Sequence, residues 1–159
     1  MVGVPDFSEQ SRVWIYTANR RLSEAERDNM NALLKSFAQR WVSHNRSLKA
    51  HAQVIEDLFV LLMVDESQAG ASGCSIDASV HFLKEMQEQF DIDLFDRMNF
   101  SFVSDGGFQL AGRNDFLRLY QSGEIDDKTI VANTLVKTKG ELDAKFLIPL
   151  GESWHRRMV

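Results

Sequence analysis

The sequence predicts an α+β fold of the ferredoxin-like (βαββαβ) type, in which two helices cover one face of an antiparallel sheet. The first reason is the order of apolar patterns between residues 12 and 104, which reads strand, helix, strand, strand, helix, strand. The second is residues 58–64, seven apolar residues between Asp57 and Asp65, which are typical of a strand buried on both faces. The 159 residues suit a single domain, in which residues 105–159 form a C-terminal α/β extension packed on this core.

The first strand and the first helix have clear signals. Residues 12–18 are rich in β-branched and aromatic side chains, which favour a pleated strand. Ser23 and Glu26 match a capping box, in which the serine hydroxyl accepts from the Glu26 backbone N–H and the Glu26 carboxylate accepts from the serine N–H. Apolar residues then recur at helical spacing over residues 30–41, so one face of the helix is apolar. We expect this helix to end near residues 42–45.

The middle of the chain predicts a hairpin, a second helix and a fourth strand. Residues 48–56 alternate loosely, and we expect a tight turn to join them to the buried strand that follows. A helix should begin near Ser75 or Asp77 and close at Phe90, and residues 98–104 alternate as a half-buried strand does. All four strands should share one sheet, with both helices on the same face. The side chains expected to be buried in this core are Trp14, Leu33, Phe37, Val60, Leu62, Val80 and Leu83.

The C-terminal extension has weaker patterns, which predict two short strands and two helices. These elements are a strand at 108–111, a helix from Asn114 to Gly123, a strand at 129–136 and a helix at 138–144. The turn residues 105–107 predict a hairpin into the first of these strands. Trp154, with Ile148 and Leu150, should dock on the body of the protein, because an exposed tail with large apolar residues would leave an aggregation-prone patch.

Composition argues against several classes of function. The chain has 23 acidic and 18 basic residues, a net charge of -5, and its basic residues are scattered, so we expect no binding to nucleic acid. No signal-peptide pattern and no run of about 18 apolar residues occurs, which predicts a cytoplasmic protein without membrane contact. The single cysteine, Cys74, excludes an internal disulfide. The histidines are far apart in sequence and match no metal motif, so we expect no metal site and no cofactor.

Asp65 and Glu66 follow the buried strand in a pattern similar to the Walker B strand of nucleotide hydrolases. That chemistry also needs a phosphate-binding loop, and no G-x-x-x-x-G-K-[ST] motif occurs in the chain. A buried strand that ends at the surface produces the same pattern, with solvated acids at its end. ATPase activity is therefore not expected.

Several stretches of the chain resemble those of a known family. They are VWIYTANRRLSEAE, the VDE followed by ASGCSIDASV, FDRMNF, and NTLVKTKGEL leading to SWH. Together they resemble a family of small uncharacterised bacterial proteins, some members of which carry the label "ABC transporter ATPase", and the resemblance covers nearly the whole chain. The motif order departs from a true ABC domain, because the SG-rich piece at residues 71–75 follows the acidic residues instead of preceding them.

The loop between the buried strand and the second helix is the candidate site. Residues 67–74 are small or polar and lead into a helix N-terminus, where free N–H groups can hold an anion or a small polar ligand. The candidate ligand-binding residues are Asp65, Glu66, Ser72, Gly73, Cys74, Ser75 and Asp77. An alternative is that these small residues only let the loop pack closely on a neighbouring strand or on the segment around Trp154.

Two classes of function remain open. The favoured class is a non-catalytic module of the cytosol that binds a small anionic or polar ligand or another protein, with a homodimer through sheet edges or helix faces as one arrangement. The alternative is a small enzyme that uses Cys74, at a helix N-terminus that would lower its thiol pKa, together with Asp65 or Glu66. A lone cysteine of this kind is also explained as a buried residue that fills space.

Overall fold

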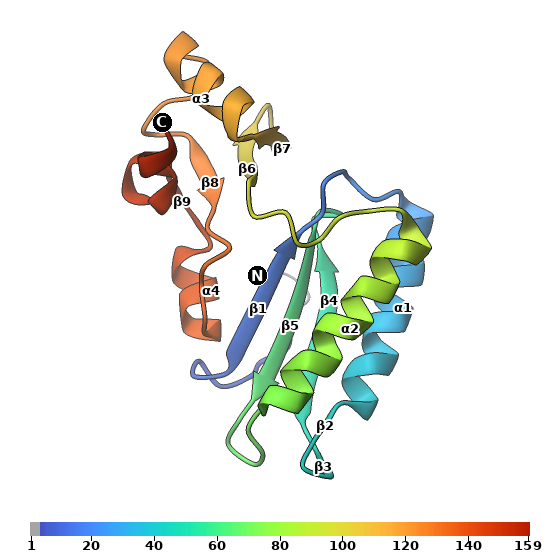
Figure 1. The fold of residues 1–159 in the computed structure, drawn as a ribbon. Helices are drawn as coiled ribbons and strands as arrows, with labels where there is room; N and C mark the ends of the chain where they lie inside the picture. Colours follow the sequence, from blue (N-terminus) through green and yellow to red (C-terminus); the bar gives the residue numbers. More distant parts are fainter. Residues whose placement is uncertain (1–3) are drawn as a thin grey trace.

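The fold is described for residues 4–159 in a computed structural model, and it combines helices with antiparallel sheets (Figure 1). The first sheet has three strands in the order β1-β5-β4. Its strands are β1 (Arg12–Thr17), β4 (Lys49–Ile55) and β5 (Phe59–Asp65). Glu56 and Asp57 both have positive φ, at 55° and 56°, and form the tight turn that joins β4 to β5. The predicted hairpin and the predicted strand at β5 are confirmed.

Two helices, α1 (Glu24–Arg40) and α2 (Gly73–Phe90), cover one face of this sheet, as expected. The capping box of Ser23 and Glu26 is present at the start of α1. The second helix begins earlier than predicted, because Ser72 accepts from the Ser75 backbone N–H and so acts as its N-cap. At the other end Asp91 takes the left-handed conformation and closes α2.

The central strand β5 has all seven of its residues buried. One set of alternating side chains, including Leu62, packs against α1 and α2. The other set, including Phe59 and Met63, packs against the C-terminal half of the chain, where the Phe59 ring contacts Phe108 and Phe146 at 5.3 Å each. The two halves therefore share a core, and β5 is buried on both faces, as predicted.

The prediction that four strands share one sheet is wrong for β6 (Asn99–Ser104). This strand lies in a second sheet of order β7-β6-β8-β9, with β7 (Gly107–Gly112), β8 (Ile130–Ala132) and β9 (Leu147–Pro149). The turn at Asp105 and Gly106, both at positive φ, pairs β6 with β7 along six residues. Phe102 of β6 also faces Val131 of β8. Local hairpin pairing and this C-terminal partner thus replace the expected pairing of β6 in the first sheet.

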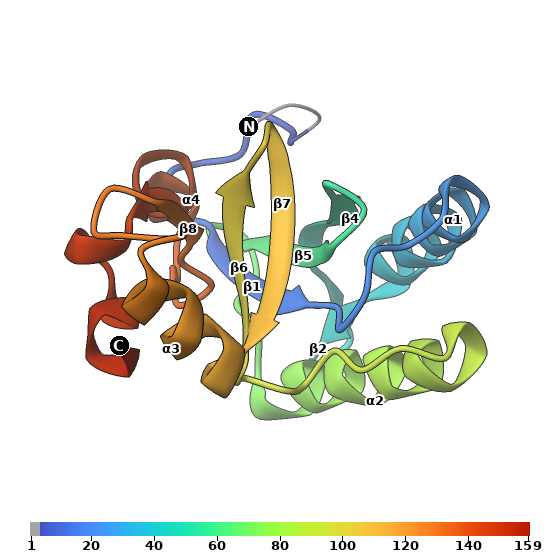
Figure 2. The ribbon, with the colours of Figure 1, turned by 90° about the horizontal axis from the view of Figure 1, so that it is seen from above.

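The C-terminal segment folds back along the body of the protein (Figures 1 and 2). Its helices are α3 (Arg113–Ser122) and α4 (Lys139–Lys145), followed by short 3₁₀ turns η1 (Leu150–Glu152) and η2 (Trp154–Met158). The N-cap of α3 is Gly112 instead of the expected Asn114. Trp154 docks as predicted, with its ring 5.5 Å from Phe100 of the second sheet. The predicted strand at 129–136 is shorter, since only three residues pair.

A small hairpin adds to the elements expected from the sequence. It consists of β2 (Val42–Ser43) and β3 (Arg46–Ser47), and its turn places His44 and Asn45 at positive φ. Among the seven predicted core residues, Phe37, Val60, Leu62 and Leu83 are buried. Leu33, Trp14 and Val80 are only half-buried, and the last two line a groove.

Candidate functional site

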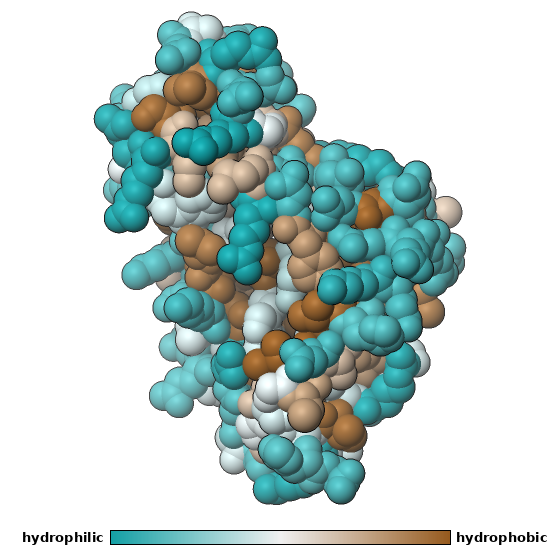
Figure 3. All heavy atoms as spheres, in the orientation of Figure 1, coloured by the Kyte–Doolittle hydropathy of each residue, from teal (hydrophilic) through white to brown (hydrophobic). Residues whose placement is uncertain are grey.

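A groove of about 890 Å³ runs beside the outer edge of β1. Its walls come from five separate parts of the chain: β1, α2, residues 94–101, residues 132–137 and η2. Figure 3 shows apolar side chains gathered in the hollowed centre of this face, between the helices and the C-terminal segment. The volume lies within the range of about 300 to 1,000 Å³ that is usual for ligand pockets.

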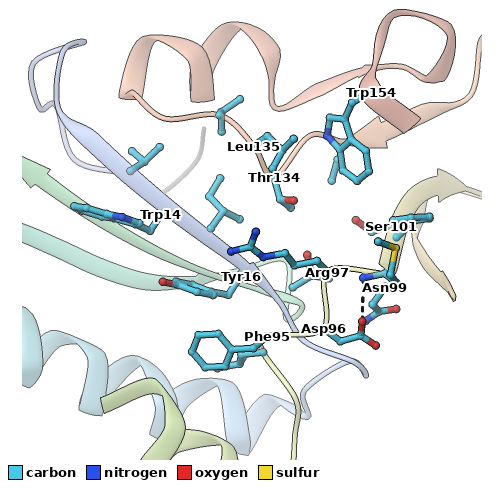
Figure 4. A pocket seen from close by; sticks show the side chains of 18 of the residues that line it. Trp14, Tyr16, Phe95, Asp96, Arg97, Asn99, Ser101, Thr134, Leu135 and Trp154 are labelled. Atoms are coloured by element: carbon cyan, nitrogen blue, oxygen red, sulfur yellow. Dashed lines mark hydrogen bonds between the residues drawn. The ribbon is translucent and has the colours of Figure 1, made fainter. Parts of the chain in front are cut away.

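Aromatic side chains form much of the lining (Figure 4). Tyr16 and Phe95 meet edge to face with their ring centroids 5.3 Å apart, and Trp14 packs on Trp41 at 5.9 Å. Trp154 lines the opposite wall. The rings of Trp14, Tyr16, Phe95 and Trp154 are half-buried and so keep part of their surface accessible, whereas Phe100 is buried. Half-exposed aromatic rings offer a ligand large contact area at a low cost in side-chain entropy.

Arg97 is a charged residue of the groove lining whose side chain is free to contact a ligand. Figure 4 shows its side chain reaching across the hollow toward Trp14 and Tyr16. Within residues 4–159 its guanidinium has no ion pair and no hydrogen bond to another side chain. Burial raises the pKa of Tyr16 above its usual 10.0, and the positive charge of Arg97 acts in the opposite direction. Asp96 lies next in sequence, but its carboxylate accepts from the Met98 backbone N–H.

The lining has a charge opposite to that of the chain. It contains three basic residues, Arg12, Arg97 and Lys137, and one acidic residue, Asp96, whereas the whole chain has a net charge of -5. Arg12 is partly committed, since its Nε lies 3.6 Å from Glu66 Oε1 and its guanidinium stacks over Trp14 at 4.8 Å. The groove is therefore a local positive site that attracts anionic groups.

The floor of the groove includes His155, whose side chain is 1% exposed. Its Nδ1 lies 2.6 Å from Ser153 Oγ, and its ring stacks on Trp154 with centroids 3.8 Å apart. Burial lowers the pKa of His155 to about 4, so the ring is neutral at physiological pH. The same Ser153 hydroxyl caps η2, which indicates that this serine and histidine hold the C-terminal turn in place.

The loop predicted as a ligand site has a different organisation. Asp65 is 6% exposed; its Oδ1 accepts from the Ser67 N–H and its Oδ2 lies 3.4 Å from Lys49 Nζ. These contacts, first the hydrogen bond from the Ser67 backbone, lower the pKa of the Asp65 carboxyl. Glu66 accepts from the Ala71 N–H at 2.9 Å. Both predicted carboxylates therefore already have partners, in the loop and on neighbouring strands.

The rest of that loop forms the start of α2. Ser72 and Ser75 cap the helix reciprocally, each hydroxyl accepting from the other residue's backbone N–H. Cys74 and Asp77 are exposed, so the explanation of Cys74 as a buried space-filling residue is wrong. A Cβ at Gly73 would meet no atom within 4 Å, so close packing does not explain that glycine. Ser72 and Ser75 contact each other directly, and ligand binding by the seven predicted residues stays a prediction.

Sequence reasoning misses the groove because its lining is assembled from distant segments. Two of its residues do carry a signal, since Trp14 and Tyr16 alternate on one face of a predicted strand. The same alternation is typical of residues that face the core. Nothing local shows that the sheet leaves this strand at its edge.

Comparisons with protein-family models, with curated proteins and with solved structures find no match to this chain. In residues 4–159 no helix has both the length and the apolar character needed to cross a bilayer. Across the same residues, no three His, Cys, Asp or Glu side chains gather where they could hold a metal ion. Function is therefore inferred from the geometry of this chain.

Proposed function

We propose that this chain is a non-catalytic binding module whose groove takes a ligand with an aromatic or apolar part and an anionic group. The observation that carries the proposal is Arg97, a cation without an acidic partner among the described residues, set among half-exposed aromatic rings. An anion that reaches Arg97 forms a charge-assisted hydrogen bond, which is about twice as strong as a neutral one. The rings of Trp14, Tyr16 and Trp154 provide contact area for the apolar part of the ligand.

The state of His155, at the floor of the groove, and of its partner Ser153 favours a binding role over a catalytic role. His155 is neutral, and its Nδ1 is already engaged with Ser153. Its low pKa, about 4, makes it a poor proton acceptor at neutral pH. The groove thus combines a fixed cation and aromatic walls with a structural floor, which suits recognition.

A titration with aromatic carboxylates tests the proposal. The probes are phenylacetate, indole-3-acetate and naphthoate, each compared with its uncharged carboxamide. Trp14 and Trp154 line the groove and are two of the three tryptophans, so intrinsic fluorescence reports on it directly. We expect the carboxylates to change the fluorescence and raise the melting temperature, and the carboxamides to do so much less, because only the carboxylates pair with Arg97.

A matched pair of variants locates the binding site. Arg97→Gln should abolish the carboxylate response, whereas Arg46→Gln should keep it, because Arg46 is exposed in β3 and does not line the groove. Both variants change the net charge equally, so a general electrostatic effect would alter both alike. Equal responses of the two variants, or equal binding of carboxylates and carboxamides, would contradict the proposal.

A further inference from the structure

Among residues 4–159, part of the outer edge of β1 has main-chain groups that pair with no strand. β1 pairs with β5 along its whole length, through residues such as Trp14 and Tyr16 whose N–H and C=O point toward β5. Val13 points the other way, since its N–H donates to the Lys137 carbonyl at 3.0 Å. Ile15 and Thr17 share the direction of Val13, because alternate residues of a strand face the same neighbour. Among residues 4–159 neither has a strand partner on that side.

Lys137 and Thr138 pair with the outer edge of β1, but the residues before them do not. Thr138 forms an isolated antiparallel bridge with Arg12, and Lys137 pairs with Val13. The preceding residues turn away, because Asn133 Oδ1 accepts both from the Leu135 N–H and from Trp154 Nε1. Leu135, next in line to face Ile15, is 57% exposed. An antiparallel ladder is thus started at one end of the groove and left open along the rest.

The open position is the one that a fourth strand would occupy. A four-stranded split βαβ sheet would place β6 on this edge of β1, but β6 pairs instead in the second sheet. At the far end the Asn99 side chain reaches across and donates to the Ala18 carbonyl at 2.9 Å. Val80 of α2 is half-buried and lines the groove, so the helix already covers the empty position from one face. The groove therefore lies where a fourth strand would pair with β1, and α2 covers that position from one face.

We infer that the ligand of the groove is an extended acidic peptide segment that adds to β1 as a strand. The inference rests on the proposed function and specifies its ligand. Main-chain hydrogen bonds to Ile15 and Thr17 would provide affinity, as in other peptides that bind at sheet edges. An acidic side chain on the helix side would meet Arg97, in keeping with the positive lining. The apolar side chains of the segment would alternate to the other face of the strand, beside Ile15 and Leu135, which also line the groove.

A second copy of this chain fits the edge less well. Pairing of β1 with another β1 would bring the Arg12 and Arg97 side chains of the two copies into one groove. Like charges in that position oppose association. An acidic partner has the complementary charge, so the inference commits to a separate acidic segment.

Hydrogen exchange of four consecutive amides tests the edge in the free protein. Trp14 and Tyr16 donate toward β5 and should exchange slowly, whereas Ile15 and Thr17 should exchange faster. The inward amides of β1 therefore serve as controls for the outward amides of the same strand. Equal protection of all four amides in the free protein would overturn the inference, because the edge would then be closed by residues 133–136 or by a second copy.

A peptide with alternating chemistry tests strand addition. The probe is an acetylated and amidated hexapeptide that alternates valine with glutamate, so that one register places every glutamate on the Arg97 side. Its binding should slow exchange at Ile15 and Thr17 and leave Trp14 and Tyr16 unchanged. Two N-methylated forms are compared, one methylated on the valine amides and the other on the glutamate amides. Only one form should bind, because alternate N–H groups of an added strand face β1 and the others face away.

A substitution in β1 gives the same test from the protein side. Ile15→Pro removes an outward N–H that the fold does not use, and proline is tolerated at such an edge position. Loss of that hydrogen bond should weaken hexapeptide binding by roughly threefold to tenfold. Ile15→Val keeps the N–H and should bind normally. A cooperative urea transition shows that Ile15→Pro is folded; if the variant does not fold, the two methylated peptides decide the matter on the unaltered chain.

The outcomes separate the inference from the proposed function. Binding of both methylated hexapeptides, or of neither when the unmethylated form binds, would overturn strand addition and leave the groove as an anion-binding site. Binding of the aromatic carboxylates without any hexapeptide binding would have the same meaning. If neither class of probe binds, both proposals fail. A dimer that is lost in Ile15→Pro would overturn the acidic segment in favour of a second copy.

Discussion

The loop at residues 65–75 and the groove beside β1 use their polar groups in opposite ways. In the loop, Asp65 and Glu66 accept from backbone N–H groups of the loop itself, and two serines cap the helix that follows. In the groove, Arg97 and the outward amide of Ile15 have no partner among residues 4–159. A loop with satisfied polar groups is a structural element, whereas unpaired groups in a hollow are available to a ligand.

This difference shows why a suggestive sequence motif is the weaker candidate. Carboxylates, serines and glycines at a helix N-terminus are the residue types of many sites, but they are also the types that build turns and caps. Whether such groups are free depends on their neighbours in space. Substitutions in the loop should therefore change stability, and substitutions in the groove should change binding.

The largest expected effect concerns the floor of the groove, which belongs to the core. His155 is buried and its folded-state pKa is about 4, below the value of about 6.5 in an unfolded chain. Between these values the unfolded state takes up a proton that the folded state does not, so stability is full above about pH 6.5 and falls as the pH drops toward 4. The loss should reach about 3 kcal/mol, measured by urea denaturation at a series of pH values.

The His155→Gln variant is the control for this prediction. Glutamine does not titrate, so the variant should lose the component of acid sensitivity between pH 6.5 and 4, whatever its stability at pH 7. Asp65 also contributes to acid sensitivity, but its lowered pKa places that loss below the usual aspartate value of 3.8. A stability of the unaltered chain that is constant from about pH 7 to 4.5 would contradict the burial of a neutral His155.

The cap at the start of α2 should have the next largest effect. Ser72→Ala removes the hydroxyl that accepts from the Ser75 N–H, and the loss of such an N-cap costs about 1 kcal/mol. Ser36→Ala is the matched control, since Ser36 is exposed within α1 and only accepts from Arg40, and it should change the free energy of unfolding much less. Equal effects of the two substitutions in chemical denaturation would show that the Ser72 cap is not used.

The fold can be predicted from sequence where signals are local. The Ser23 capping box, the seven-residue apolar strand β5 and the turn at Asp105 and Gly106 each determine their element through neighbours in the chain. The sheet to which β6 belongs cannot be predicted in this way. Its alternation suits either sheet, and the choice depends on β7 and on Val131, which lies far along the chain from its partner Phe102. The groove follows from that choice, so it has no local signal either.

Two glycines of the loop should respond in opposite directions and by less than the cap. Gly73 lies at the start of α2, where an added Cβ would have no atom within 4 Å, so Gly73→Ala should stabilise the fold by about 0.4 to 1 kcal/mol through the unfolded state. At Gly70 an added Cβ would lie 3.0 Å from Glu66 Oε2, which accepts from the Ala71 N–H. Gly70→Ala should therefore lower the melting temperature. A fall in both variants would indicate that the loop is packed more closely than the structure shows.

The smallest effect on stability is expected at Arg97. Comparing Arg97→Gln in the groove with Asp65→Asn in the loop separates a binding role from a structural role most clearly. Arg97 is exposed and has no hydrogen-bonding partner in residues 4–159, so Arg97→Gln should change the free energy of unfolding by less than about 0.5 kcal/mol. Asp65→Asn, which changes the charge by one unit in the loop, should cost more stability, because it weakens the contact to Lys49 and the hydrogen bond from Ser67.

Urea denaturation of both variants, together with fluorescence titration by indole-3-acetate, measures the two effects on the same samples. We expect Arg97→Gln to be stable and unable to bind, and Asp65→Asn to be less stable and still able to bind. The reverse pattern would assign the ligand to the loop and a structural role to the groove.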